Sequence, residues 1–159
     1  QPKQIRRHVG FVFSNPDAQI IMPTVAEDVA LTLRGRGLSR TEIRARVAAE
    51  LERFGLAGYA DSPAHTLSGG QKQLLALCAV LVGKPGLIVA DEPTACLDAA
   101  NSKRVAGFLL GETSRQLVIA THDLRLAARC DLAIRFEAGR LVDRGDPAAV
   151  IARYEEDQL

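Results

Sequence analysis

Two carboxylates follow directly on a short apolar run in the middle of the chain. The run covers residues 87–90 (Leu-Ile-Val-Ala), and Asp91 and Glu92 come next. Ligands of open α/β sheets bind beyond the carboxyl ends of the strands, so a strand here would deliver both acids to a ligand site. Asp91 could hold Mg²⁺, directly or through water, and Glu92 could polarise an attacking water. The alternative is a strand that simply ends in solvated acids.

A second candidate site is Leu67-Ser68-Gly69-Gly70-Gln71, which opens a helix predicted to run to about residue 82. Bare glycines allow the backbone to approach a polyanion closely. The N-terminus of a helix offers free N–H groups and the positive end of the dipole, and Ser68 adds a hydroxyl donor. The alternative is a Ser-Gly-Gly loop that caps an ordinary helix.

Two shorter segments complete the candidates. Residues 93–98 follow the paired acids and end in Asp98, which can cap the next helix and still take part in a site. Thr121-His122-Asp123 follows a second apolar run, residues 117–120. A lone histidine at a strand end is more often structural, but its place after a second parallel-type strand favours a functional role for His122.

The elements that must position these residues can be read from periodicity and turn chemistry. Strands are expected at 9–13, 87–90 and 117–120, the last two fully buried, and a hairpin at 134–136 and 140–142. Helices are expected at 25–33, after the Ser39–Glu42 capping box, at 68–82, after Asp98, and after Asp146-Pro147. The second half alternates strand and helix, which is typical of a parallel α/β protein. Residues 25–82 contain only helix and loop, which indicates a helical subdomain inserted in the α/β core of one domain, 1–159.

Composition narrows the class of protein. The 159 residues include 47% apolar and 25% charged residues, values of an ordinary globular domain. A net charge of +1 and 4% aromatic residues give no sign of a nucleic-acid partner. No apolar run approaches the ~20 residues of a membrane span, and no leader is evident at the start. Three scattered cysteines indicate a reducing cytosol rather than a disulfide framework or a zinc site.

Taken together, in this order and spacing, the four segments resemble the ATP-binding cassette (ABC) ATPases, from about Arg6 onward. Residues 67–71 resemble the LSGGQ signature and 88–92 the Walker B strand with its catalytic glutamate. Residues 95–98 resemble the D-loop, His122 the switch histidine, and 12–16 the Q-loop, with Ser14 at the position of its glutamine.

This resemblance implies a P-loop NTPase fold and hydrolysis of ATP with Mg²⁺. Asp91 would serve the metal, Glu92 the hydrolytic water and His122 the γ-phosphate. The signature residues Ser68, Gly69, Gly70 and Gln71 would close over ATP held by a second ATPase subunit, in a homodimer or a heterodimer.

The segments 13–19 and 24–29 resemble the energy-coupling-factor importers, which take up cobalt, nickel or vitamins such as biotin. In that family the stretch after the Q-loop meets a transmembrane coupling subunit at the cytoplasmic face of the membrane. The alternative is an ordinary loop of the helical subdomain.

The chain departs from the family pattern at two points. Ser14 is shorter than glutamine, so we expect weaker coupling between transport and hydrolysis. No G-x-x-x-x-G-K-[ST] loop occurs; the Gly83-Lys84 pair is followed by Pro85. We expect that phosphate loop and the first strands upstream of Gln1. The chain alone should therefore bind ATP poorly, be inactive, leave part of its sheet uncovered and tend to aggregate.

The sequence thus predicts an ATPase subunit that powers import of a small solute. One alternative is a degenerate cassette that only pairs with an active one; Glu92 and His122 argue against it, whereas Ser14 and the missing loop favour it. The other is an ABC ATPase of nucleic-acid or ribosome metabolism, but such proteins usually carry tandem cassettes, coiled coils or basic arms that are not seen here.

Overall fold

The computed structural model describes residues 5, 7–111 and 114–158. Two compact units make up the chain, Gln1–Val118 and Ile119–Leu159, and each is described by itself. No helix in the described ranges is long and apolar enough to cross a membrane. The three cysteines are all free thiols.

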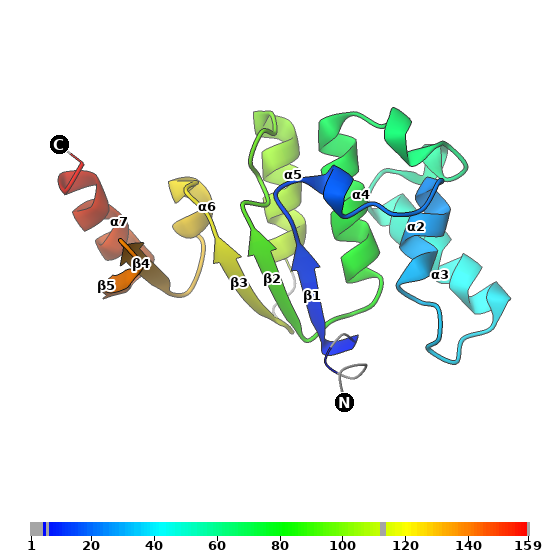
Figure 1. Ribbon diagram of the computed structural model, residues 1–159, viewed down its shortest axis with the longest axis horizontal. Helices are drawn as coiled ribbons and strands as arrows, with labels where there is room; N and C mark the ends of the chain where they lie inside the picture. The colour runs from blue at the N-terminus through cyan, green and yellow to red at the C-terminus, as the bar shows by residue number, and fades with distance from the viewer. Residues whose placement is uncertain (1–4, 6, 112–113, 159) are drawn as a thin grey trace. The chain divides into compact units, whose positions relative to one another are not determined.

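Three helices separate the first two strands (Figure 1), and the division between the two units falls within β3. The first unit contains β1 (Val9–Val12), α2 (Val25–Leu31), α3 (Arg40–Arg53), α4 (Gly69–Leu81), β2 (Leu87–Asp91) and α5 (Ala99–Leu110), with the 3-10 turns η1 (Pro16–Ala18), η2 (Ala57–Tyr59) and η3 (Ala64–Thr66). The strand β3 spans Gln116–Ala120, and the second unit continues with α6 (Leu124–Ala127), β4 (Ala133–Glu137), β5 (Arg140–Gly145) and α7 (Pro147–Glu156).

The three-stranded sheet has the order β1-β2-β3. Strand β1 runs parallel to β2, with Val12 opposite Ala90. Parallel strands have their carboxyl ends at one edge, so this register places the residues after Val12 beside those after Ala90. The α/β architecture expected from the sequence is therefore confirmed.

The helices between β1 and β2 begin where their caps predict. Ser39 and Glu42 form the expected capping box at the start of α3, with Ser39 N donating to Glu42 Oε2 over 2.8 Å. Thr24 and Glu27 form a second capping box at the start of α2. Such reciprocal bonds satisfy backbone donors that the first helical turn leaves open. Each helix then buries one apolar face in the core of the first unit.

The expectation that β2 and β3 are fully buried is wrong. Ile88 and Ala90 are fully buried, but Val118 of β3 is 55% exposed. Phe11 of β1 is 52% exposed and Phe13, just after this strand, is 46% exposed, and their rings stack with centroids 6.5 Å apart. Within the described part of the first unit, helices α4 and α5 lie on the same side of β1 and β2 (Figure 1), and Phe11 of β1 remains exposed.

The second unit is a hairpin with one helix packed against it. Strands β4 and β5 pair antiparallel, with a register shift between Arg135 and Phe136. Arg153 of α7 donates two hydrogen bonds to the Asp143 carboxylate, at 2.7 and 3.0 Å, and these lower the pKa of Asp143. The short helix α6, which the sequence did not predict, is capped by the side chain of Asp123.

Candidate active site

The paired carboxylates lie at the carboxyl end of β2, as expected. Asp91 is the last residue of the strand and is exposed. Glu92, the next residue, has a φ of 44° and Cys96 has a φ of 59°, so both lie in the left-handed region. A residue other than glycine costs on the order of 1–3 kcal/mol in such a conformation, and strain of this kind concentrates at functional sites. The chain therefore changes direction immediately after Asp91.

Ser14 lies at the same edge of the sheet. It follows β1 by two residues, and the register of Val12 opposite Ala90 brings this point of the chain next to the end of β2. Its side chain is exposed. The structure therefore brings together the position of the Q-loop and the two acids, Asp91 and Glu92, within the first unit.

The Gly-Gly segment forms the first turn of α4. Ser68 is the N-cap, and its Oγ accepts a hydrogen bond from Gln71 N while Gln71 Oε1 accepts one from Ser68 N at 2.8 Å. Ser68 therefore caps the helix, and its hydroxyl hydrogen can still donate, so the role of this segment in nucleotide binding stays a prediction. The Gln71 amide oxygen, by contrast, is engaged in the cap.

The two glycines have different surroundings. A Cβ on Gly69 would meet no atom within 4 Å, so the backbone there is open to close approach. A Cβ on Gly70 would lie 2.4 Å from Asn101 Nδ2, so this glycine serves the contact between α4 and α5. The free N–H groups of the helix start remain a favourable place for an anion beside Gly69.

Asp98 caps α5 and is held by Asn101. Its Oδ1 accepts from Asn101 N at 2.7 Å and its Oδ2 accepts from Asn101 Nδ2 at 2.9 Å. The backbone bond from Asn101, then the side-chain bond, lower the pKa of Asp98. Asn101 thereby connects the D-loop position to Gly70 of the signature segment. Nothing in its local pattern marked Asn101 as part of a site.

His122 belongs to the second unit, between the end of β3 and α6. It is exposed, and its neighbours define a tight turn in which Asp123 N donates to Thr121 Oγ1 at 3.0 Å. Asp123 Oδ1 in turn accepts from Arg125 N, at 3.0 Å, and from Leu126 N. The histidine is thus presented on a loop whose ends are fixed by hydrogen bonds.

Further residues that sequence reasoning missed support the loop after β1. Gln19 and Gln73 donate or accept three hydrogen bonds with the backbone at Phe11 and Phe13. Lys72 Nζ lies 2.7 Å from Asp17 Oδ1. The Gln73–Phe13 and Lys72–Asp17 pairs join residues more than fifty positions apart, so no local signal could have found them.

The donor set fits Mg²⁺ held jointly with a nucleotide. The described residues contain no group of three His, Cys, Asp or Glu side chains that could hold a metal ion by themselves. Magnesium in nucleotide sites is commonly held through one or two carboxylates together with substrate phosphates. An exposed Asp91 at the carboxyl end of β2 matches that mode of binding.

Comparisons with known proteins identify the family of this chain. The family model described as ABC transporter matches residues 1–95. The chain is 46% identical over 155 residues to an ABC transporter ATP-binding protein of Deinococcus radiodurans, covering 98% of this chain and 68% of that one. It is 46% identical over 154 residues to the biotin transport ATP-binding protein BioM of Rhizobium etli, covering 97% and 68%.

A solved structure extends the match to the fold. The cbiO1 protein of Clostridium perfringens, part of the ABC transporter complex cbiONQ, superposes with a TM-score of 0.83 at 35% identity. That match covers 96% of this chain and 62% of the other. The chain therefore spans about two thirds of the length of these three proteins. By motif, geometry and sequence identity, the chain belongs to the ABC transporter ATP-binding proteins and carries their P-loop NTPase fold.

Proposed function

We propose that this chain is part of an ATPase subunit that powers import of a small solute, a metal ion or a vitamin such as cobalt or biotin, as in energy-coupling-factor transporters. The observation that carries the proposal is the placement of Asp91, Glu92 and Ser14 at one edge of a parallel sheet. The identity with a biotin transport protein supports the solute class.

Mg²⁺–ATP, when bound, supplies the phosphoryl group that water attacks and the metal charge that offsets the developing negative charge. Asp91 would hold the metal, directly or through water. Glu92 orients the attacking water and accepts its proton. His122 contributes a donor to the γ-phosphate. The open backbone at Gly69 and the hydroxyl of Ser68 face the nucleotide of a second ATPase subunit, which pairs with this one as a homodimer or a heterodimer.

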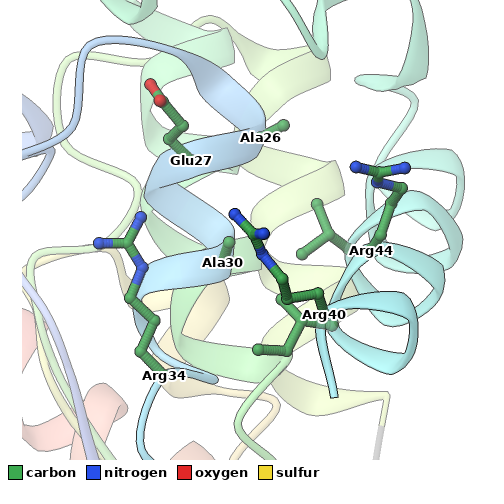
Figure 2. Close-up of a pocket in the computed structure, with 8 residues that line it drawn as sticks. Ala26, Glu27, Ala30, Arg34, Arg40 and Arg44 are labelled. Atoms are coloured by element: carbon green, nitrogen blue, oxygen red, sulfur yellow. The ribbon is translucent and has the colours of Figure 1, made fainter. Parts of the chain in front are cut away.

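A groove between α2 and α3 offers a place for the membrane partner. It holds about 620 Å³, and small or apolar residues of both helices form part of its lining: Ala26, Ala30, Ile43 and Val47. Figure 2 shows Arg40 and Arg44 on α3 across from Arg34 and Glu27. We propose that a segment of the transmembrane coupling subunit docks here, which would hold the ATPase at the cytoplasmic face of the membrane as a peripheral subunit.

Charge reversal in the groove tests the docking. In the natural full-length protein, Arg40→Glu combined with Arg44→Glu should abolish co-purification with the membrane subunit and leave basal ATP hydrolysis within twofold of the wild type. Arg46→Glu is the matched control, because Arg46 is exposed on the same helix but does not line the groove. Retained co-purification of the double variant would contradict the docking site.

Hydrolysis itself is tested with purified full-length protein, Mg²⁺ and ATP. Release of phosphate that is lost in Glu92→Gln supports a working ATPase. Absence of hydrolysis in the wild type, together with binding to an active relative, would instead favour the degenerate cassette that acts only as a pairing partner. Stimulation by DNA, RNA or ribosomes and not by membrane partner would favour a role in nucleic-acid or ribosome metabolism.

A further inference from the structure

Both backbone polar groups of Phe13, the residue before Ser14, are held by side-chain amides. Phe13 N donates to Gln19 Oε1 at 3.0 Å, and Phe13 O accepts from Gln73 Nε2 at 3.2 Å. These two amides come from different elements, because Gln19 follows η1 whereas Gln73 lies in α4. The backbone just after β1 is therefore hydrogen-bonded both to Gln19, in the loop that follows β1, and to Gln73 of α4, the helix that Ser68 caps.

Gln73 is a polar residue in an otherwise apolar position. Only 2% of its surface is exposed, and its neighbours Leu74 and Leu75 are fully buried. A buried amide without a hydrogen-bond partner is costly, so a buried glutamine is placed where its amide has a defined partner. Here that partner is the carbonyl oxygen of Phe13, sixty residues earlier in the chain.

Gln19 bridges the strand and the helix in a second place. Its Nε2 carries two hydrogens, and it donates to Phe11 O at 3.1 Å and to Ala76 O at 3.4 Å. One side chain thus contacts the backbone at Phe11 in β1, at Phe13 just after β1, and at Ala76 in α4. Such a connection resists sliding of α4 along β1.

An ion pair adds a third link between the same two segments. Lys72 Nζ lies 2.7 Å from Asp17 Oδ1, and Asp17 belongs to η1, whose N-cap Asn15 accepts from Asp17 N. The Asp17 side chain is 65% exposed, so this link is screened and weaker than the amide bonds. All three links join residues 13–19 to the first three turns of α4.

We propose that Gln73 and Gln19 are positioning residues that make the loop carrying Ser14 and the helix carrying the signature move as one body. The inference rests on the proposed ATPase function and deepens it. Ser14 follows Phe13 directly, and Ser68 caps α4, so the amide clamp (Gln19, Gln73 and the Phe13 backbone) sets their spacing within one subunit. When nucleotide or a membrane partner shifts this loop, the signature segment then moves together with it.

The test uses the natural full-length protein and the substitution Gln73→Met, which keeps the length of the side chain and removes the N–H donor. We expect kcat for ATP hydrolysis to fall at least tenfold while KM for ATP changes less than twofold, because the clamp acts on closure of the site and not on initial binding. Val105→Ala is the control, since it removes buried apolar volume from α5 and leaves the clamp intact. Circular dichroism shows whether each variant is folded.

A charge swap provides the rescue experiment. Asp17→Lys and Lys72→Asp, made singly, place like charges together and should each lower kcat, whereas the double variant restores the pair and should recover the wild-type rate within twofold. Given an active wild type, three results would overturn this inference and leave the proposed function standing. They are a Gln73→Met variant as active as the wild type, an equal loss of kcat in Val105→Ala, and a double charge swap that does not recover the rate. A wild type without hydrolysis would overturn the proposed function as well.

Discussion

Adjacent glycines at the start of α4 should respond differently to the same substitution. Gly69→Ala adds a methyl group to open space, and alanine in a helix is about 0.5–1 kcal/mol more favourable than glycine. Gly70→Ala gains the same propensity but places Cβ 2.4 Å from Asn101 Nδ2 and 2.6 Å from Asn101 Cγ. Because real contacts are never this close, Asn101 must move.

The cost of that movement can be estimated from its contacts. Asn101 Nδ2 would lose its 2.9 Å hydrogen bond to Asp98 Oδ2, which contributes about 1 kcal/mol. A displaced, less favourable rotamer adds roughly 0.5–1 kcal/mol. The free energy of unfolding of Gly70→Ala should therefore be about 1–2 kcal/mol lower than that of Gly69→Ala.

Urea unfolding followed by circular dichroism measures this difference, and the background Asn101→Ala supplies the control. Once the amide of Asn101 is gone, Gly69→Ala and Gly70→Ala should have equal stabilities within error. The reasoning is refuted if the two variants are equally stable with Asn101 present, or if the gap persists after Asn101 is removed. In the full-length protein, Gly69→Ala should be stable yet impaired in hydrolysis, since its methyl group occupies the open backbone surface.

Three further predictions concern other parts of the same unit. Gly10→Ala would place Cβ 2.4 Å from Val80 Cγ1, so the free energy of unfolding should fall by about 1–3 kcal/mol in a urea titration; an unchanged midpoint would contradict the close packing of α4 on β1. The depressed pKa of Asp98 contributes stability that is present above the ordinary aspartate value of about 3.9 and is lost as pH falls through the folded pKa. Asn101→Ala should raise that pKa toward the ordinary value in a carboxyl NMR titration, and an unmoved titration would argue against the cap as its cause. Ser14→Gln should raise the ATPase rate of the full-length protein, and an unchanged rate would show that the shorter side chain does not limit hydrolysis.

Local chemistry in the sequence was sufficient to predict most helix starts. Ser39, Ser68 and Asp146 each cap the helix that follows. The capping hydrogen bond joins a side-chain oxygen to a backbone N–H three residues later, so it depends on local sequence and not on the rest of the fold. The placement of Asp91 and Glu92 at a strand end was equally local. Their roles in catalysis remain predictions.

What the sequence could not show depends on tertiary packing. Gln19 and Gln73 bond to carbonyls more than fifty residues away, and no spacing rule specifies which distant carbonyl a side-chain amide will meet. Asn101 bonds locally to Asp98, but its close approach to Gly70 depends on the packing of α4 against α5. The exposure of Val118 was missed because a continuous apolar run indicates burial on both faces only when both faces are covered. The helix at 124–127 was missed because four residues carry too little periodicity to be recognised.

The central claim, that this chain carries the catalytic end of an importer ATPase, is tested most directly by phosphate release from the natural full-length protein and its Glu92→Gln variant. The account predicts Mg²⁺-dependent hydrolysis by the wild type and a rate at least ~10²-fold lower in the variant, with ATP binding retained, because only the general base is removed. A variant that hydrolyses ATP at the wild-type rate would contradict it.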